Sequence, residues 1–413
     1  MSLGVPLSIM QEQDRYAQVL QNAMELCHYD TSIRSEVLGW FEDSILPLIQ
    51  PGPKSRWVPT LTHYNTAFEP SITTRGDGPK DKNLRITIEP IGPQATSEKD
   101  KWNQETLHQI LEKLKENIRN LDLELFNHFS KALFITPQDE WRKYEKPIPE
   151  VTPSCFLAFD IDRSKGISGI GSKAYLFPQL KSLQTGISPG SIIEEAITQL
   201  HDDDKFDVIP PVEMVMEYLQ EPGSTLTLND VEMINFDLVA LDQNPRIKIY
   251  AHSWRNTFDA AEDVYTLGGL LPENKEQLDA LEEFWKVLSN DAHEPEDWKS
   301  MPFKPLDEKD ERSRFIYSFE IMPGELVPEM KVYFPMWCFS KSDEDVRRRL
   351  DMFFELKGWK GLVGVYEKDL GTFPTRDVEK KSGLHTYVSY AKDKEGEDYV
   401  TVYWAGEAVQ VNS

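Results

Sequence analysis

Five pairs of short segments rich in β-branched and aromatic residues recur along the chain, and they constrain its fold more than any other feature. Alternating segments of this kind are typical of strands. Between them lie segments in which apolar residues recur every three or four positions, as in helices. The predicted strand pairs are 57–63 with 84–90, 154–161 with 172–178, 231–240 with 246–252, 313–322 with 330–337, and 384–391 with 398–404. The predicted helices are 8–27, 31–49, 103–133, 190–201, 211–219, 274–288 and 343–357.

The chain thus repeats a unit of about two helices and two strands. Hairpins followed by helical returns predict one antiparallel sheet with its helices on one side. About ten strands can close into a barrel, and closure removes the exposed sheet edges. We therefore predict an α+β fold, a ten-stranded antiparallel β-barrel surrounded by α-helices in repeated ααββ units, as a single domain over residues 1–413.

The charge balance excludes several classes of partner. The 70 acidic residues outnumber the 45 basic ones, which gives a net charge of −25. Such a surface repels nucleic acid and anionic membranes, and no run of 18 apolar residues predicts a membrane span. The N-terminal residues lack a secretory pattern, and Cys27, Cys155 and Cys338 form neither a disulfide framework nor a zinc motif. We expect a cytoplasmic protein that holds any anionic ligand with a local cluster of cations.

The second strand of each predicted pair carries basic residues or tyrosines at alternate positions. Side chains on a strand alternate faces with a period of two, so these residues share one face. One such strand would fit an ordinary amphipathic strand with solvated Lys and Tyr. Recurrence on three hairpins, with apolar residues suited to packing on helices between them, favours a polar face inside the barrel. The residues are Arg85, Lys173, Tyr175, Arg246, Lys248, Tyr250, Lys331, Tyr333, Tyr399 and Tyr403.

These two residue types together suit an allylic diphosphate. Buried cations are costly unless they are paired, and a diphosphate supplies the counter-charge. Arginine donates forked hydrogen bonds to phosphate oxygens, and lysine adds point charge. When the allylic C–O bond breaks, tyrosine rings attract the resulting cation by about 0.5–2 kcal/mol each and exclude water.

The order and spacing of FEPSI, LRITIEP, KAYLFP, RIKIY, KVYFP and the closing Y-x-x-x-Y resemble the fungal dimethylallyltryptophan-synthase-type indole prenyltransferases. The resemblance implies the ABBA or PT barrel, in which the ten residues above bind the diphosphate and shield the dimethylallyl cation. It also implies transfer of a dimethylallyl group from dimethylallyl diphosphate to an aromatic ring by Friedel–Crafts alkylation, in secondary metabolism. Dimethylallyl diphosphate is then a co-substrate, and neither a metal nor another cofactor is expected.

Glu69, in FEPSI, is the predicted catalytic residue. It matches the acidic residue that in this family accepts a hydrogen bond from the indole N–H. Such a bond raises the electron density of the ring, which must attack the cation. The alternative is a helix cap formed by Glu-Pro-Ser, because proline is favourable at the first position of a helix.

Two positions depart from the family members that use free tryptophan, and we place both in the acceptor pocket. Phe156 stands where those members carry a lysine, and Glu232 aligns best with their carboxylate-binding arginine. Both changes favour a larger or uncharged indole, such as a tryptophan-containing cyclic dipeptide or an indole alkaloid. A phenolic acceptor and a non-catalytic barrel that binds an anionic amphiphile are the alternatives. Small molecules are the expected partners, and a homodimer is left open.

Two further motifs are interpreted without a functional role. Residues 203–207 match D-D-x-x-D, the magnesium–diphosphate motif of all-helical prenyl synthases, but they follow the end of a predicted helix. Carboxylates there gain nothing from the helix dipole, so a solvated loop is the better interpretation. The glycine-rich residues 166–171 are interpreted as a flexible hairpin turn.

Overall fold

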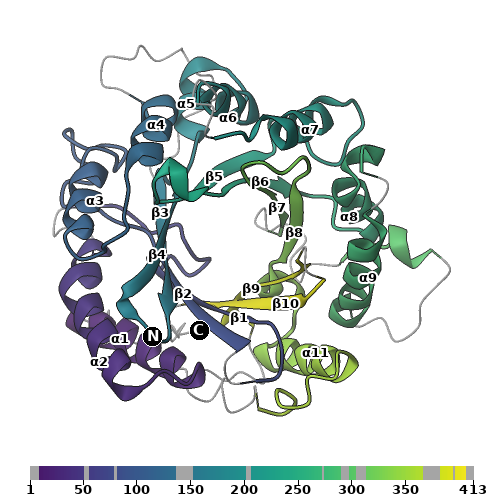
Figure 1. Cartoon of the computed structure of the whole chain (residues 1–413), viewed down its shortest axis with the longest axis horizontal. Helices are drawn as coiled ribbons and strands as arrows, with labels where there is room; N and C mark the ends of the chain where they lie inside the picture. The colour runs from purple at the N-terminus through teal and green to yellow at the C-terminus, as the bar shows by residue number, and fades with distance from the viewer. Residues whose placement is uncertain are drawn as a thin grey trace, which may run out of the picture.

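A closed barrel of ten antiparallel strands forms the centre of the molecule (Figure 1). The computed structural model describes residues 9–50, 55–78, 81–135, 152–200, 206–271, 274–289, 297–303, 313–365, 382–393 and 396–405. Each strand pairs with its neighbours in the chain, and β1 closes the barrel against β10. The strands are β1 Phe68–Thr74, β2 Lys82–Ile88, β3 Cys155–Asp162, β4 Gly166–Leu176, β5 Val231–Asp237, β6 Ile247–Ser253, β7 Phe315–Ile321, β8 Glu329–Phe334, β9 His385–Lys392 and β10 Asp398–Trp404.

Helices surround the barrel on its outside (Figure 1). Several begin at a side-chain cap: the hydroxyls of Ser188, Thr257 and Ser342 accept a backbone N–H three residues later, which satisfies a donor that the helix leaves free. The α-helices are α1 Ile9–Leu26, α2 Thr31–Trp40, α3 Leu107–Lys115, α4 Glu124–Leu133, α5 Gln179–Thr185, α6 Pro189–Thr198, α7 Ile209–Gln220, α8 Phe258–Tyr265, α9 Lys275–Ser289, α10 Met336–Phe339 and α11 Asp343–Leu356.

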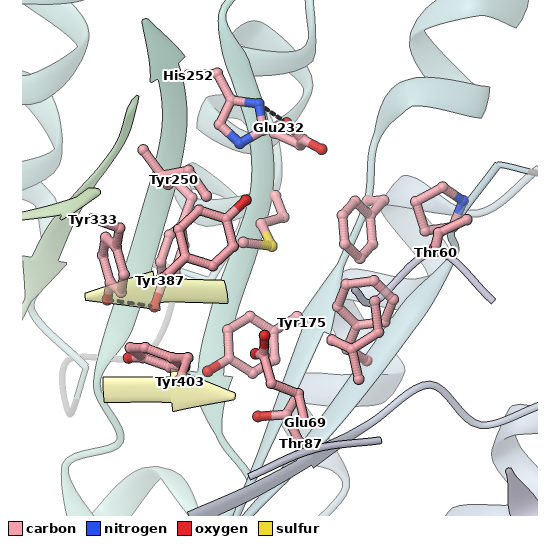
Figure 2. A pocket seen from close by; sticks show the side chains of 16 residues that line it. Thr60, Glu69, Thr87, Tyr175, Glu232, Tyr250, His252, Tyr333, Tyr387 and Tyr403 are labelled. Carbon is pink, nitrogen blue, oxygen red and sulfur yellow. Dashed lines mark hydrogen bonds and ion pairs between the residues drawn. The ribbon is translucent and has the colours of Figure 1, made fainter. Parts of the chain in front are cut away.

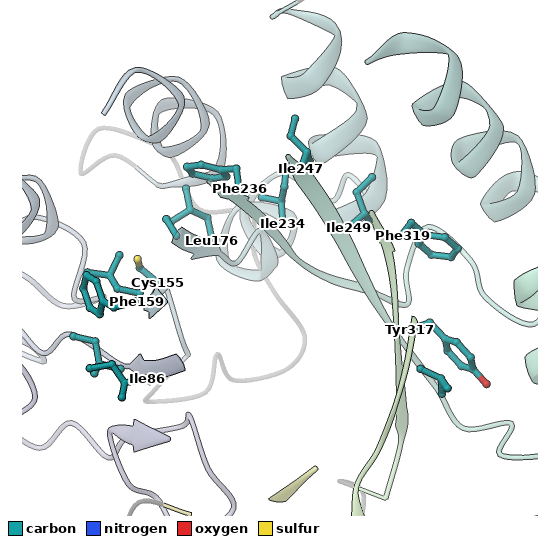
Figure 3. Packing of buried hydrophobic residues seen from close by; sticks show 14 of the residues in the cluster. Ile86, Cys155, Phe159, Leu176, Ile234, Phe236, Ile247, Ile249, Tyr317 and Phe319 are labelled. Atoms are coloured by element: carbon teal, nitrogen blue, oxygen red, sulfur yellow. The ribbon is translucent and has the colours of Figure 1, made fainter. Parts of the chain in front are cut away.

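The main hydrophobic core lies between the strands and these helices. On β6, Ile247, Ile249 and Ala251 are buried in that core, and Figure 3 shows Ile247 and Ile249 on the side of the sheet that faces the helices. The alternate residues of the same strand, Lys248 and Tyr250, line the inside of the barrel. The period of two therefore turns the polar face inward, and the predicted fold class is confirmed.

The first predicted strand is wrong. Residues 57–63 form no strand, and β1 starts only at Phe68. The carboxylate of Glu89 explains the difference, because it accepts the backbone N–H groups of Thr60 at 2.5 Å and Leu61 at 3.0 Å. These donors are satisfied without a neighbouring strand. Glu69 consequently lies on a strand, which rules out the helix-cap interpretation.

Two other boundaries differ from the predictions. The predicted helix over 103–133 is two helices, α3 and α4, and the N–H of Asp122 between them donates to the carbonyl of Leu238. Residues 166–171 belong to β4 rather than to a turn. The turn comes just before them, where Asp162 accepts the N–H groups of Ser164 and Lys165. Asp203 and Asp204 of the D-D-x-x-D motif lie outside the described residues.

Candidate functional site

Two cavities lie inside the barrel and share part of their wall. The first, here called the aromatic chamber, has a volume of about 300 Å³ and contains Glu69, Phe156 and Glu232 in its lining. The second, here called the cationic chamber, has a volume of about 260 Å³ and is lined by Arg85, Arg246, Lys248 and Lys331 among others. Tyr333 and Tyr403 line both cavities.

Four tyrosines form a continuous layer between the chambers, here called the tyrosine layer. It consists of Tyr175, Tyr250, Tyr333 and Tyr403, which come from β4, β6, β8 and β10. Successive ring centroids lie 5.9, 5.8 and 5.9 Å apart, and Figure 2 shows the four side chains gathered inside the barrel. Burial raises the pKa values of Tyr175, Tyr250 and Tyr403 above the usual range, so these phenols stay neutral.

All five predicted cations lie inside the barrel, but four of them already have acidic partners that the sequence analysis missed. Three carboxylates on odd-numbered strands stand opposite basic residues on the preceding strand: Asp160 opposite Arg85, Asp237 opposite Lys173, and Glu320 opposite Lys248. The ion pairs are Arg85–Asp160 at 2.6 Å, Lys173–Asp160 at 3.0 Å, Lys173–Asp237 at 2.6 Å, Arg246–Asp237 at 2.9 Å, Arg246–Glu320 at 3.3 Å and Lys248–Glu320. The partners hold the pKa values of Asp160 and Asp237 well below the usual range.

Lys331 differs from the other four cations. Its Nζ donates to Thr401 Oγ1 at 3.3 Å and lies 4.6 Å from the centre of the Tyr399 ring. Within the described part of the chain, no carboxylate lies within ion-pair distance of it. Burial, with Lys248 and Arg85 nearby, lowers the pKa of Lys331 well below its usual value. Lys331 is therefore the cation that most lacks a counter-charge.

Arg75 is a further basic residue of the cationic chamber. Its guanidinium pairs with Asp393 at 2.5 Å and lies 4.4 Å from the centre of the Tyr399 ring. Arg75 is not among the predicted site residues, because the first strand is predicted over 57–63, ahead of the true position of β1. With β1 in its true position, Arg75 follows Glu69 at even spacing, which would have put both on the inward face.

The aromatic chamber surrounds the Glu69 carboxylate. This side chain is buried, with 6% of the residue exposed, and Oε1 accepts a hydrogen bond from Thr386 Oγ1 at 2.7 Å. Burial raises the pKa of Glu69 to about 8. Tyr175 and Tyr403 of the tyrosine layer line the same cavity as this carboxylate (Figure 2).

The predicted acceptor-pocket residues Phe156 and Glu232 line this same chamber. Figure 2 places Glu232 at the opposite end from Glu69, next to His252. His252, Met233 and Tyr387 also line the chamber and are not among the predicted site residues. Of these, His252 was open to detection, because it continues the alternation of Arg246, Lys248 and Tyr250.

The described residues contain no group of three or more His, Cys, Asp or Glu side chains arranged to hold a metal ion. No described helix has the length and apolar character needed to cross a membrane.

Solved structures share this architecture. The crystal structure of AnaPT from Neosartorya fischeri superposes with a TM-score of 0.78 at 22% identity, covering 98% of this chain and 96% of that one. The structure of NotF in complex with brevianamide F and DMSPP gives a TM-score of 0.79 at 21% identity, covering 99% and 97%. The ten-stranded barrel is thus the ABBA fold of prenyltransferases.

The sequence comparisons then identify the family. Residues 13–369 match the model of tryptophan dimethylallyltransferase, and the chain belongs to this family. Among its relatives, 7-dimethylallyltryptophan synthase from Aspergillus fumigatus is 29% identical over 94% of this chain and 82% of the relative. A tryptophan dimethylallyltransferase from Penicillium expansum is 27% identical over 94% and 84%. The protein is therefore a dimethylallyl-transferring enzyme, and the alternative of a non-catalytic barrel is ruled out.

Proposed function

We propose that this enzyme transfers the dimethylallyl group of dimethylallyl diphosphate to an indole-containing acceptor by Friedel–Crafts alkylation. The observation that carries the proposal is the order of parts along the barrel: a basic chamber, a layer of four tyrosines, and a largely apolar chamber that contains the buried carboxylate of Glu69. This order matches the order of a donor, a reactive cation and an acceptor.

The cationic chamber binds the diphosphate in this mechanism. The chamber is lined by four basic residues that donate to phosphate oxygens: Arg85, Arg246, Lys248 and Lys331. Lys173 forms ion pairs with Asp160 and Asp237, the carboxylates that also pair with Arg85 and Arg246. Arg75 and the carboxylates of Asp160, Asp237, Glu320, Glu329 and Asp393 belong to the same region, so five basic residues balance five acidic ones and Lys331 is the basic residue in excess. A bound diphosphate would favour the protonated form of Lys331, which burial disfavours in the empty barrel.

The tyrosine layer acts between donor and acceptor. As the C–O bond breaks, its electron pair leaves with the diphosphate, and the allyl fragment becomes a cation. The rings of Tyr175, Tyr250, Tyr333 and Tyr403 stabilise that cation and keep water away from it, and Tyr399 contributes from the donor side. Because burial raises the pKa values of Tyr175, Tyr250 and Tyr403 and keeps these phenols neutral, they do not capture the cation as phenolates would.

Glu69 acts on the acceptor. Its carboxylate accepts the indole N–H, which raises the electron density of the ring and favours the positive charge that builds up as the new C–C bond forms. Loss of a ring proton then restores aromaticity. Phe156 lines the aromatic chamber in place of the lysine of tryptophan-using relatives, so proton removal here relies on another group or on water. A phenolic acceptor fits the same chemistry, and the family membership favours the indole.

We further propose that the enzyme works in the cytoplasm, because its three cysteines, Cys27, Cys155 and Cys338, are buried and form no disulfide with one another.

The test is a mass-spectrometric screen of indoles, tryptophan-containing cyclic dipeptides and phenols with dimethylallyl diphosphate. We expect a product 68 mass units heavier than an indole acceptor, by about the mass of C5H8, and we expect turnover to persist in excess EDTA because protein cations supply the charge that binds the diphosphate. Strict dependence on magnesium would contradict the metal-independent mechanism and would favour a magnesium-binding role for the D-D-x-x-D motif at residues 203–207. Alkylation of phenols alone would contradict the indole acceptor.

A further inference from the structure

A β-bulge places one additional carboxylate in the aromatic chamber. Between β5 and β6 the register shifts, with Val231 opposite Ala251 and Met233 opposite Tyr250, so Glu232 has no partner in the ladder. A bulge of this kind re-aims the extra residue. As a result, Glu232 and its neighbour Met233 both line the chamber, although adjacent residues of a regular strand point to opposite faces.

Glu232 is held as a carboxylate. His252 Nδ1 contacts Glu232 Oε2, as Figure 2 shows. Among the described residues, His252 is the side chain that forms an ion pair with the Glu232 carboxylate. His252, through charge and hydrogen bonding, and Arg314 lower the pKa of Glu232 below its usual value in spite of its burial. The second oxygen, Oε1, is left for a ligand, and 28% of the Glu232 side chain is exposed.

The surroundings of Glu232 select for one kind of acceptor group. Besides His252, the lining of the chamber is largely apolar and aromatic, with Phe156, Phe177, Met233 and Ile316. The Tyr387 phenol also lines it, and burial, together with charges that include Glu232, raises the pKa of Tyr387 above its usual range. Arg314 places its guanidinium 5.3 Å from the centre of the Trp254 ring and is not part of the lining. A ligand carboxylate at this end would face the Glu232 carboxylate, whereas an ammonium group would gain a charge-assisted hydrogen bond.

We propose that Glu232 is a specificity-determining residue that binds an ammonium group on the acceptor's side chain, and that the acceptor is an indolic amine without a free carboxylate. Glu69 then binds the indole N–H at one end of the chamber, and Glu232 binds the amine at the other (Figure 2). The inference rests on the proposed function, because it assigns the acceptor of that same reaction.

Three 3-substituted indoles of similar size separate the charge states. Tryptamine carries the ammonium, 3-propylindole replaces the ammonium by methyl, and indole-3-propionate carries a carboxylate. With the wild-type enzyme and dimethylallyl diphosphate, we expect kcat/KM for tryptamine to exceed that for 3-propylindole roughly 10- to 100-fold, which is the effect of one charge-assisted hydrogen bond. We expect indole-3-propionate to have the lowest kcat/KM of the three. A ratio near one, or a preference for the carboxylate, would overturn the inference.

Variants tie the preference to the residue. Glu232→Gln is expected to bring the tryptamine to 3-propylindole ratio within a few-fold of one, because kcat/KM for tryptamine falls when the charged partner of its ammonium group is removed. Glu217→Gln, which makes the same change at an exposed position on α7, is the matched control and should keep the wild-type ratio. An unchanged ratio in Glu232→Gln would overturn the inference even though indoles are turned over. Failure of wild type with every indole would instead overturn the proposed function.

Discussion

The protonation state of a single buried carboxylate, Glu69, governs the acceptor side of the site. Its pKa is raised to about 8 by burial, so the empty enzyme holds the proton at neutral pH. Only the ionised form makes the charge-assisted bond to an indole N–H. We predict that kcat/KM for the acceptor rises with pH up to about 8 and then levels. In Glu69→Gln this rise of kcat/KM with pH should be absent. The fall in kcat should also be larger than the increase in KM for the acceptor.

Stability measurements provide the control for Glu69. A carboxyl whose pKa is raised in the folded state contributes stability below its unfolded pKa and loses it as the pH rises through the folded pKa, here about 8. Glu69→Gln lacks this loss, so its Tm relative to wild type should increase between pH 6 and pH 9. A wild-type kcat and an unchanged rise of kcat/KM with pH in Glu69→Gln would remove the residue from the mechanism.

Lys331 and Lys173 test two different consequences of burying a cation. Protonated Lys331 is disfavoured in the empty barrel, because burial and Lys248 lower its pKa. We predict that Lys331→Met keeps or raises Tm but raises KM for dimethylallyl diphosphate roughly 10- to 100-fold, the effect of one charge-assisted bond. Lys173→Met leaves Asp160 and Asp237 short of a partner and should lower the free energy of unfolding by about 3–5 kcal/mol.

Steady-state kinetics and denaturant unfolding of the two lysine variants decide between these outcomes. An unchanged KM for dimethylallyl diphosphate in Lys331→Met would place the diphosphate elsewhere. Equal unfolding free energies for Lys173→Met and wild type would show that Asp160 and Asp237 are sufficiently paired by Arg85 and Arg246.

At the scale of elements, helix α11 fixes the start of strand β9 and thereby the partner of Glu69. Asp343, the first residue of α11, accepts the backbone N–H groups of Leu384 and His385 at 3.0 Å each and contacts His385 Nδ1 at 2.8 Å. Both side chains are fully buried. The next residue, Thr386, donates to Glu69. Asp343 is thus a positioning residue that acts through β9.

Asp343→Asn tests this positioning. The variant loses charge-assisted bonds, and we predict that the free energy of unfolding falls by about 1.5–3 kcal/mol for each bond lost. The Thr386 hydrogen bond lowers the pKa of Glu69. A displaced β9 should therefore also shift the rise in kcat/KM for the acceptor to higher pH. Thr386→Val should produce the same shift with a smaller loss of stability. A destabilised Asp343→Asn whose rise in kcat/KM occurs at the wild-type pH would make the contact structural only.

For the whole molecule, closure of the barrel depends on the last hairpin. The family match ends at residue 369, yet β9 and β10 follow it, and β10 pairs with both β9 and β1. A chain that ends at residue 397 leaves two open sheet edges, which promote aggregation. We predict that it elutes as aggregate in size-exclusion chromatography and lacks turnover. A monodisperse, active protein would contradict the role of β10 in closure.

The fold class and the side of the sheet on which the functional residues lie follow from the amino-acid sequence alone. Alternation along a strand is a local property, so Lys173 with Tyr175, and Lys331 with Tyr333, could be assigned to one face before any partner was known. The repeated order of helices and strands, with motifs resembling a known family, then indicated a closed barrel.

Which residues oppose one another depends on how the strands pair in three dimensions. Asp160, Asp237 and Glu320 are ordinary polar residues in the sequence, and they become partners of the cations through strand register alone. The side chain of Glu89 keeps residues 57–63 out of the sheet, and the bulge that turns Glu232 inward exists only where β5 meets β6. Register, bulges and long-range hydrogen bonds depend on contacts between distant segments, whereas alternation depends on the backbone of a single strand.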